Sequence, residues 1–292
     1  MTLQIEQQNI EIDREDIDSW CPMFALPCYD RALTEPFFMS FMKTVMYCKD
    51  IGLKFAVSTI TDSLINRARN NLVAKFMANP KFTHLIFLDV DLSFRPEDIV
   101  KLLWHDKDIM TGAYPIKEIN WEKVVKNVND GIESKDLAKK STRFVVNPVR
   151  SGGNTIETDN GAISVHDAGT GFMCIKREVF EKMMTAYPEL KFRDDTGSMK
   201  GAELDNTYAF FNSYVDDDGR FVSEDYGFCR YWQKIDGKVW VDPGIEIGHL
   251  GRMSYEGSMI DYLVEISNET TKDNARALAQ PKSKNQSKKS KK

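Results

Sequence analysis

Short apolar runs that alternate with amphipathic helical patterns constrain how the first 115 residues of this chain can fold. The apolar runs lie at 23–29, 53–60, 83–90 and 107–115, and a helical pattern separates each from the next. Strands joined through helices pair in parallel, because the crossover helix returns the chain to the same edge of the sheet. The sequence therefore predicts an α/β fold, a mostly parallel sheet with helices on both faces.

Helix boundaries can be proposed from capping residues. Asp62 or Ser63 is placed to cap the helix that follows the second apolar run. Ser93 is placed to cap the next helix, with Pro96 inside its first turn and Glu97 as the partner in a capping box. Ligands in wound sheets bind beyond the carboxyl ends of the strands, so we expect the chemistry at those ends.

The pattern weakens after residue 116, and fewer elements can be assigned there. We expect short strands at 143–148 and 162–166, a strand leading into a helix over 171–188, loops with a short strand over 189–222, a helix over 223–237 that Ser223 caps and Gly237 ends, and a strand with a loop over 238–251.

Charge, cysteine usage and apolar run length exclude several classes of protein. The net charge is −5, but residues 282–292 contain six Lys and no acid, so removing those six charges leaves −11 on residues 1–281. Such an acidic body argues against a nucleic-acid-binding surface. The five cysteines are scattered and form no CxxC pair, which fits a reducing cytoplasm, or the host cytoplasm if the source is viral. No run approaches the roughly 18 apolar residues of a membrane-spanning helix, and the N-terminus does not look like a secretory signal.

Three parts of the chain follow from composition. We expect an acidic leader or edge element over 1–20, one domain over 21–270, and a disordered Lys-rich tail over 271–292. The tail has two interpretations, a solubilising segment or a weak, salt-sensitive contact with an anionic membrane.

The most informative motif is the acidic pair Asp89 and Asp91 at the end of the apolar run 83–90. Two carboxylates at i and i+2 on an extended chain point to the same side. Oxygen ligands of this kind suit Mg²⁺ or Mn²⁺, which keep open positions for substrate phosphates. The alternative is a solvated strand end whose acids cap a helix.

A second motif covers the helix start that follows the second strand. It contains Asp62, Ser63, Arg67, Arg69 and Asn70. A helix N-terminus and two Arg side chains suit the phosphates of a nucleotide. The alternative is an ordinary helix start with surface Arg side chains that pair with acids.

Three further features are weaker when taken singly. Gly169–Phe172 permits close approach of a ligand to the backbone or forms a tight turn. Glu224 and Asp225 open a helix, where acids either cap it or provide a general base. His249 is either structural or a ligand of Mn²⁺. The sequence contains neither a GxGxxG helix start nor a GxxxxGK[ST] loop, which argues against dinucleotide oxidoreductases and P-loop NTPases.

Taken together and in order, these motifs resemble the GT-A class of nucleotide-sugar glycosyltransferases, in particular the family-2-like enzymes of bacteria and phages. The matching segments are DSLINRARNNLVAKF (62–76), THLIFLDVDLSFRPEDIVKLL (83–103), DIMTGAYPIK (108–117), GTGFMCIKREVFEKM (169–183), SEDYGFCRYW (223–232) and VDPGIEIGHLG (241–251). The resemblance implies a Rossmann-like sheet of GT-A type with an α+β extension on the acceptor side.

The resemblance also implies a role for each motif. Asp91 matches the direct metal ligand, Asp89 the acid nearer the ribose or the metal, and His249 the late histidine of the metal or diphosphate site. The implied donor-binding residues are Asp62, Ser63, Arg67, Arg69, Asn70 and, at the end of the fourth strand, Tyr114 and Lys117. The donor sugar and the acceptor would meet at Gly169, Thr170, Gly171 and Phe172, and Glu224 or Asp225 would supply the base.

The implied activity is transfer of a sugar from a nucleoside-diphosphate sugar, such as a UDP- or GDP-sugar, to an acceptor hydroxyl on a glycan or glycoconjugate, with Mn²⁺ or Mg²⁺. The segment 25–32 lacks the usual acids that hold a nucleobase, which leaves the base open. One alternative is a nucleotidyltransferase, although 28–36 is not the Gly-rich basic loop of that class. The other is a non-catalytic glycan-binding protein. No nucleic-acid partner is expected.

Overall fold

A nine-stranded mixed sheet forms the centre of the chain up to Gly251, which is one compact unit. The computed structural model describes residues 3–5, 10–144, 146–151, 155–254 and 256–265. The strand order is β11-β12-β16-β7-β13-β5-β3-β4, with β8 paired to β12. The main strands are β3 (Pro22–Pro27), β4 (Ala56–Ile60), β5 (His84–Leu88), β7 (Ile109–Gly112), β12 (Ala162–Ala168), β13 (Phe172–Lys176) and β16 (Val239–Asp242).

Most strands of this sheet point the same way. The strand β3 pairs in parallel with both β4 and β5, and β16 pairs in parallel with β7. The antiparallel strand β13 lies between β5 and β7, and β12 is antiparallel to β16, to β11 and to β8. Only β12 and β13 therefore oppose the other seven described strands, which confirms the α/β class and the mostly parallel sheet.

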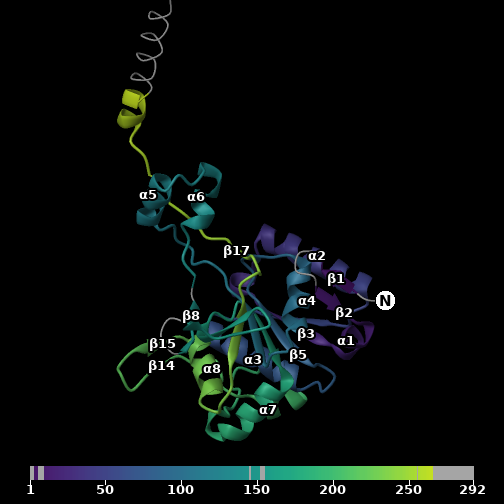
Figure 1. Cartoon of the computed structure of the whole chain (residues 1–292). Helices are drawn as coiled ribbons and strands as arrows, with labels where there is room; N and C mark the ends of the chain where they lie inside the picture. The colour runs from purple at the N-terminus through teal and green to yellow at the C-terminus, as the bar shows by residue number, and fades with distance from the viewer. Residues whose placement is uncertain (1–2, 6–9, 145, 152–154, 255, 266–292) are drawn as a thin grey trace, which may run out of the picture. The chain divides into compact units, whose positions relative to one another are not determined.

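Side-chain alternation along the strands builds a hydrophobic core on each face. In β5, Ile86 and Leu88 face one cluster, and Leu85 and Phe87 face the other. Successive residues of a strand point to opposite faces, so an uninterrupted apolar strand fills both cores. Helices α2 (Glu35–Ile51) and α4 (Pro96–Trp104) pack side by side over the first cluster (Figure 1). Helices α3 (Ile65–Met77), α7 (Arg177–Ala186) and α8 (Glu224–Gln233) contribute to the second.

The helix starts differ in detail from the sequence prediction. The N-cap of α4 is Arg95, and the carboxylate that completes its capping box belongs to Asp98 instead of Glu97. Ser93 lies in strand β6 (Leu92–Ser93), where its backbone pairs with Gly248, and it therefore cannot cap α4. The N-cap of α3 is Leu64, not Asp62 or Ser63, and the Asp62 carboxylate accepts the N–H of Leu64, outside the helix.

Several elements were not predicted from the sequence. In the first twenty residues, β1 (Leu3–Ile5) pairs with β2 (Ile10–Ile12) and α1 (Arg14–Ser19) follows, with Ile10, Ile12 and Ile17 buried in the first cluster. Between β7 and β12 lie the packed helices α5 (Trp121–Asn129) and α6 (Ser134–Lys140). The short strand expected over 143–148 is β8 (Val146–Pro148), and the segment 189–222, where one short strand was expected, contains β14 (Tyr214–Val215) and β15 (Phe221–Val222). The other small elements are η1 (Tyr29–Arg31), β9 (Arg150–Ser151), β10 (Thr155–Ile156), β11 (Thr158–Asp159), η2 (Pro188–Leu190), η3 (Gly201–Asn206) and β17 (Gly248–His249).

The chain beyond Gly251 forms a second unit, of which the structure describes only part. Residues 259–265 are helical and expose apolar side chains, among them Met259, Ile260 and Leu263. The Lys-rich tail expected over 271–292 lies outside the described residues. Among the described helices, none is both long enough and apolar enough to span a membrane.

A buried ion pair in α4 provides a test of the fold. Asp98 is fully buried, and its Oδ1 lies 3.3 Å from the buried Lys101 Nζ. Asp98→Asn leaves the Lys101 charge buried without this carboxylate, so we expect the free energy of unfolding to fall by about 3 kcal/mol or more. Urea denaturation measures this loss.

The control for this prediction is Glu122→Gln, the same chemical change on an exposed acid in the first turn of α5. A surface change of this kind typically alters stability by less than about 0.5 kcal/mol. The double variant Asp98→Asn/Lys101→Met should recover part of the loss, because it removes the unpaired charge. Equal stability of Asp98→Asn and Glu122→Gln would contradict the role of the buried pair.

Candidate active site

Asp89, the first acid of the pair after β5, is held on two sides. Its N–H donates to Gly171 O at 2.8 Å, which continues the pairing of β5 with β13. Its carboxylate lies 3.4 Å from Arg69 Nη2, which projects from α3. Asp89 is therefore fixed by one backbone contact and one ionic contact.

Arg69 joins this acid to a second acidic pair. Its side chain is almost completely buried, with 4% of the residue exposed, and its Nε lies 3.6 Å from Glu224 Oε1 at the start of α8. Burial opposes the charge of Arg69, but the Asp89 and Glu224 carboxylates outweigh it and raise the pKa of the guanidinium. Burial also raises the pKa of Glu224, against the attraction of Arg69. Asp89, Arg69 and Glu224 form one chain of charges from β5 to α8.

Asp91 has a separate set of partners. Lys117 Nζ contacts Asp91 Oδ2, and His249 Nε2 lies 3.6 Å from Asp91 Oδ1. Burial favours the neutral acid, but the interactions with His249 and Lys117 outweigh it and lower the pKa of Asp91 to about 2. The carboxylate is therefore ionised at neutral pH.

The orientation of His249 is set by its neighbours. The strand β17 pairs with β6, which places His249 opposite Leu92 and beside Asp91. His249 Nδ1 lies 2.7 Å from Pro115 O, and since a carbonyl only accepts, Nδ1 must carry the proton. Nε2 is then the ring nitrogen that faces Asp91.

Asp91 and His249 are the residues of this site that could hold a metal ion. They offer one hard oxygen and one imidazole nitrogen, a donor set that Mn²⁺ accepts. A histidine whose other nitrogen donates to a carbonyl is a common arrangement around protein-bound metals. Among the residues that the structure describes, no three His, Cys, Asp or Glu side chains gather closely enough to hold a metal. A cation here would therefore take most of its ligands from substrate or water.

The segment Gly169–Phe172 packs tightly against Asp89. The Gly171 N–H donates to Tyr114 Oη at 3.0 Å, and a Cβ at Gly171 would lie 2.6 Å from Asp89 Oδ2. A Cβ at Gly169 would lie 2.3 Å from Tyr114 Oη. The Thr170 side chain is buried, and its hydroxyl has no hydrogen-bond partner among the described residues. The Phe172 ring is buried against Phe94, 5.0 Å between centroids, and so belongs to the core.

A cavity of about 450 Å³ lies at the carboxyl ends of β3 and β4. It is lined by the predicted residues Asp62, Ser63 and Arg67. The Arg67 guanidinium pairs with the Asp62 carboxylate, at 2.6 Å from Nε to Oδ2, and this hydrogen bond lowers the pKa of Asp62. A second cavity, about 200 Å³, shares Asp62 and Ser63 with it.

Sequence reasoning missed four residues of the larger cavity, namely Tyr29, Asp30, Thr61 and Ser198. Tyr29 is 70% exposed, and Asp30 has a positive φ of 56°. The sequence signal for Tyr29 and Asp30 was the segment YDR (29–31), which begins two residues after the end of β3. Residues that follow the carboxyl ends of strands in a wound sheet lie at the edge where ligands bind.

Two predicted residues have other surroundings. The Asn70 amide is buried and bonds the backbone of Phe211 in both directions, at 3.0 Å as donor and 2.9 Å as acceptor. We therefore do not include Asn70 in the candidate site. Asp225 Oδ1 accepts from Ser223 Oγ and from the Tyr226 N–H. Ser223 is the N-cap residue of α8, as predicted. Its hydroxyl, however, donates to the Asp225 carboxylate and makes no cap hydrogen bond with the helix backbone.

Comparison with known proteins yields structural matches only. No protein-family model matches the sequence, and no curated protein matches it.

Three of the solved structures that match are distant. The first is A197 from STIV, at 14% identity and a TM-score of 0.42, with 80% of this chain and 86% of that chain covered. The second is GalNAc-T7 with UDP, GalNAc and Mn²⁺, at 11% identity and a TM-score of 0.45. The match covers 88% of this chain and 47% of that chain, so this chain spans about half the length of GalNAc-T7. The third is 4-diphosphocytidyl-2C-methyl-D-erythritol synthase from Anaerococcus prevotii, at 8% identity and a TM-score of 0.35, with 86% of this chain and 98% of that chain covered. Similarity at this level supports no inference about activity.

The close approach at Gly171 generates a testable prediction. Gly171→Ala adds a methyl group at 2.6 Å from Asp89 Oδ2, a carboxylate that Arg69 and the backbone hold in place. Overpacking of this kind costs about 1–3 kcal/mol, so urea denaturation should show a loss of that size. Gly257→Ala is the control, since its added Cβ meets no described atom within 4 Å. Identical unfolding curves for the two variants would contradict the packing around Asp89.

Proposed function

We propose that this chain is a metal-dependent glycosyltransferase that moves a sugar from a nucleoside-diphosphate sugar to an acceptor hydroxyl of a glycan or glycoconjugate. The observation that carries the proposal is the buried Arg69, which connects Asp89 after β5 to Glu224 at the start of α8. This ion-pair chain holds Asp89, two residues before the proposed metal ligand Asp91, next to the start of α8, where the proposed base Asp225 follows Glu224.

The cavity beyond β3 and β4 suits the nucleoside. Its volume of about 450 Å³ falls within the usual range of small-molecule sites. The exposed Tyr29 ring provides a surface on which a base can stack, and Asp30 and Asp62 offer acceptors to ribose or base. The donor phosphates would then extend toward the carboxyl end of β5.

The diphosphate requires positive charge as it leaves. Asp91 and His249 would hold Mn²⁺ or Mg²⁺, and such an ion, when bound, offsets the charge that develops on a leaving diphosphate. Lys117 adds a cation that already contacts Asp91. It lies on the loop after β7, at the same edge of the sheet as Asp91.

Asp225 is the base we propose for the acceptor hydroxyl. Hydrogen bonds from Ser223 and from the Tyr226 N–H fix its carboxylate at the first turn of α8. Glu224 is less suited to this role, because it is the partner of the buried Arg69. We therefore assign Glu224 to holding Arg69 and Asp89 in position.

Metal-dependent nucleotide binding is the first expected outcome. One class among UDP-, GDP-, CMP- and dTDP-sugars should raise the melting temperature with Mn²⁺, and Asp91→Asn should abolish the shift. A ligand at 100 times its Kd stabilises by about 2.7 kcal/mol, which amounts to several degrees.

The control for that panel is Asp130→Asn, an exposed acid at the end of α5. Adding nucleoside triphosphates separates the alternatives, since a nucleotidyltransferase would bind a triphosphate in preference to the sugar donor. The absence of a shift with any nucleotide would refute the transferase proposal and leave a glycan-binding protein.

The roles of Asp225 and Glu224 can be separated kinetically. Asp225→Asn should lower kcat by about 10²–10⁴, the usual contribution of a general base, while the nucleotide-induced melting shift persists. Glu224→Gln should instead lower the unfolding free energy, because it removes one counter-charge of Arg69. Release of nucleoside diphosphate from the donor measures turnover. Loss of turnover in Glu224→Gln with normal turnover in Asp225→Asn would reverse the assignment of the base.

A further inference from the structure

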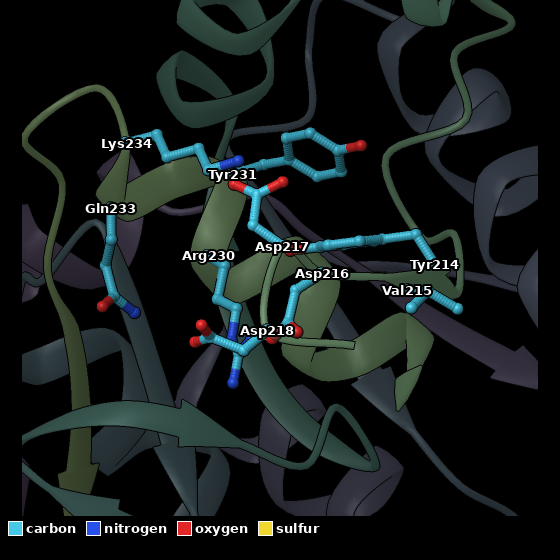
Figure 2. A pocket seen from close by; sticks show the side chains of 9 residues that line it. All are labelled: Tyr214, Val215, Asp216, Asp217, Asp218, Arg230, Tyr231, Gln233 and Lys234. Carbon is cyan, nitrogen blue, oxygen red and sulfur yellow. The ribbon is translucent and has the colours of Figure 1, made fainter. Parts of the chain in front are cut away.

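A cavity outside the donor site lies between the β14–β15 hairpin and the second half of α8. Its volume is about 620 Å³. Figure 2 shows Tyr214 and Val215 on the hairpin side and Arg230, Tyr231, Gln233 and Lys234 on the helix side, with the turn acids between them. Its lining residues are Tyr214, Val215, Asp216, Asp217, Asp218, Arg230, Tyr231, Gln233 and Lys234.

The walls of this cavity are fixed by contacts within its lining and behind it. Arg230 pairs with Asp216 of the hairpin at 3.0 Å and with Asp167 of β12 at 3.2 Å. A Cβ at Gly227 would lie 2.6 Å from Asn212 O and 3.2 Å from the Tyr214 ring, so this glycine allows the hairpin to lie directly on the helix. Tyr187 Oη donates to Tyr231 O at 2.7 Å. A preformed cavity loses little entropy when it binds a ligand.

The chemistry of the lining suits a polyhydroxylated ligand. The Tyr214 and Tyr231 rings pack on each other, 5.9 Å between centroids, and the parts of both rings that line the cavity offer an apolar surface to the C–H groups of a sugar ring. The exposed carboxylates of Asp217 and Asp218 accept hydrogen bonds from hydroxyl groups. Aromatic faces beside several hydrogen-bond acceptors match a saccharide better than an apolar compound.

The charge of the lining residues limits which saccharides the cavity can bind. The Arg230 guanidinium is compensated by Asp167 and Asp216. The remaining charges are Asp217 and Asp218 against Lys234, whose Nζ lies 5.7 Å from the centroid of the Tyr231 ring. This excess of negative charge disfavours phosphorylated or uronic-acid sugars and permits neutral and amino sugars.

The cavity and the proposed base lie on one rigid helix. Tyr231 follows Asp225 by six residues, which is about 9 Å along the axis at roughly 1.5 Å per residue and about 120° around it at roughly 100° per residue. The hairpin that forms the other wall runs directly into α8, since β15 ends at Val222 and Ser223 is the N-cap. A saccharide seated in the cavity would have to extend along α8 and partly around its N-terminal half for its end to reach Asp225, which requires an oligosaccharide.

We propose that this cavity is an acceptor subsite that binds a neutral or amino oligosaccharide whose terminal sugar reaches Asp225. The proposal rests on the proposed transferase function and adds the class of its acceptor. It also assigns Tyr231, Asp217 and Asp218 to acceptor recognition, although sequence reasoning gave them no role.

The test is binding of the full chain to a glycan array that contains neutral, amino and anionic oligosaccharides, followed by calorimetry with the best-bound probe. The variants are Asp217→Asn/Asp218→Asn and, separately, Tyr231→Leu, with Asp130→Asn as the matched surface control. We expect binding of neutral or amino probes, and a loss of about tenfold or more in affinity in both cavity variants, as for residues at the centre of a binding site. Melting curves of the free variants report whether each one folds.

Three results would overturn the subsite: no binding of neutral or amino probes, a preference for anionic ones, or wild-type affinity in both cavity variants. The nucleotide panel on the unmodified chain is evaluated separately. If it shows no nucleotide binding while the cavity variants still lose the saccharide, the transferase function fails and the acceptor role fails with it. If nucleotides bind and saccharides do not, only the acceptor subsite is overturned.

Discussion

The buried guanidinium of Arg69 is the constraint on which the site depends. An ionised group in an apolar interior is expensive unless carboxylates compensate it. Arg69 reaches the two that it needs from different parts of the chain, Asp89 after β5 and Glu224 at the start of α8. Removing either would leave the buried Arg69 with a single carboxylate partner, and breaking a buried ion pair costs about 3–5 kcal/mol. The stability of the fold is thus tied to the arrangement of the acids, and the geometry proposed for the reaction is present before substrate binds.

Strand direction explains why residues so far apart in sequence meet at one edge. Asp62, Asp89 and Lys117 follow the carboxyl ends of β4, β5 and β7, which all point the same way. The strand β13 runs oppositely, so its beginning lies at that same edge. For this reason Gly171 precedes a strand and still touches an acid that follows one. An antiparallel strand inserted in a parallel sheet therefore contributes its N-terminal loop where its neighbours contribute C-terminal loops.

The sequence predicted most of the sheet and part of the candidate site, and the difference has a physical origin. The continuous apolar run of β5 predicts a strand covered on both faces, and the acids after it cannot be buried without partners. Patterns of this kind involve neighbouring residues, so they can be recognised in the sequence. The partners themselves are not local, and nothing near Asn70 in the sequence shows that its amide will bond Phe211. Nor does the sequence near Ser93 show that its backbone will pair with Gly248 and leave the cap of α4 to Arg95.

The helix α8 connects the proposed base to the proposed acceptor subsite. Its N-terminus carries Glu224 and Asp225, where the helix dipole favours negative charge. Arg230 lies in its last turn and Lys234 is its C-cap, where the dipole favours positive charge. Each pair of charges is thus stabilised by the helix before it meets any ligand. Because a packed helix moves as a unit, an acceptor bound near Tyr231 and a base at Asp225 keep a constant separation. Acceptor length would then be measured along the helix, and the size of the saccharide selected would follow from the position of Tyr231 relative to Asp225.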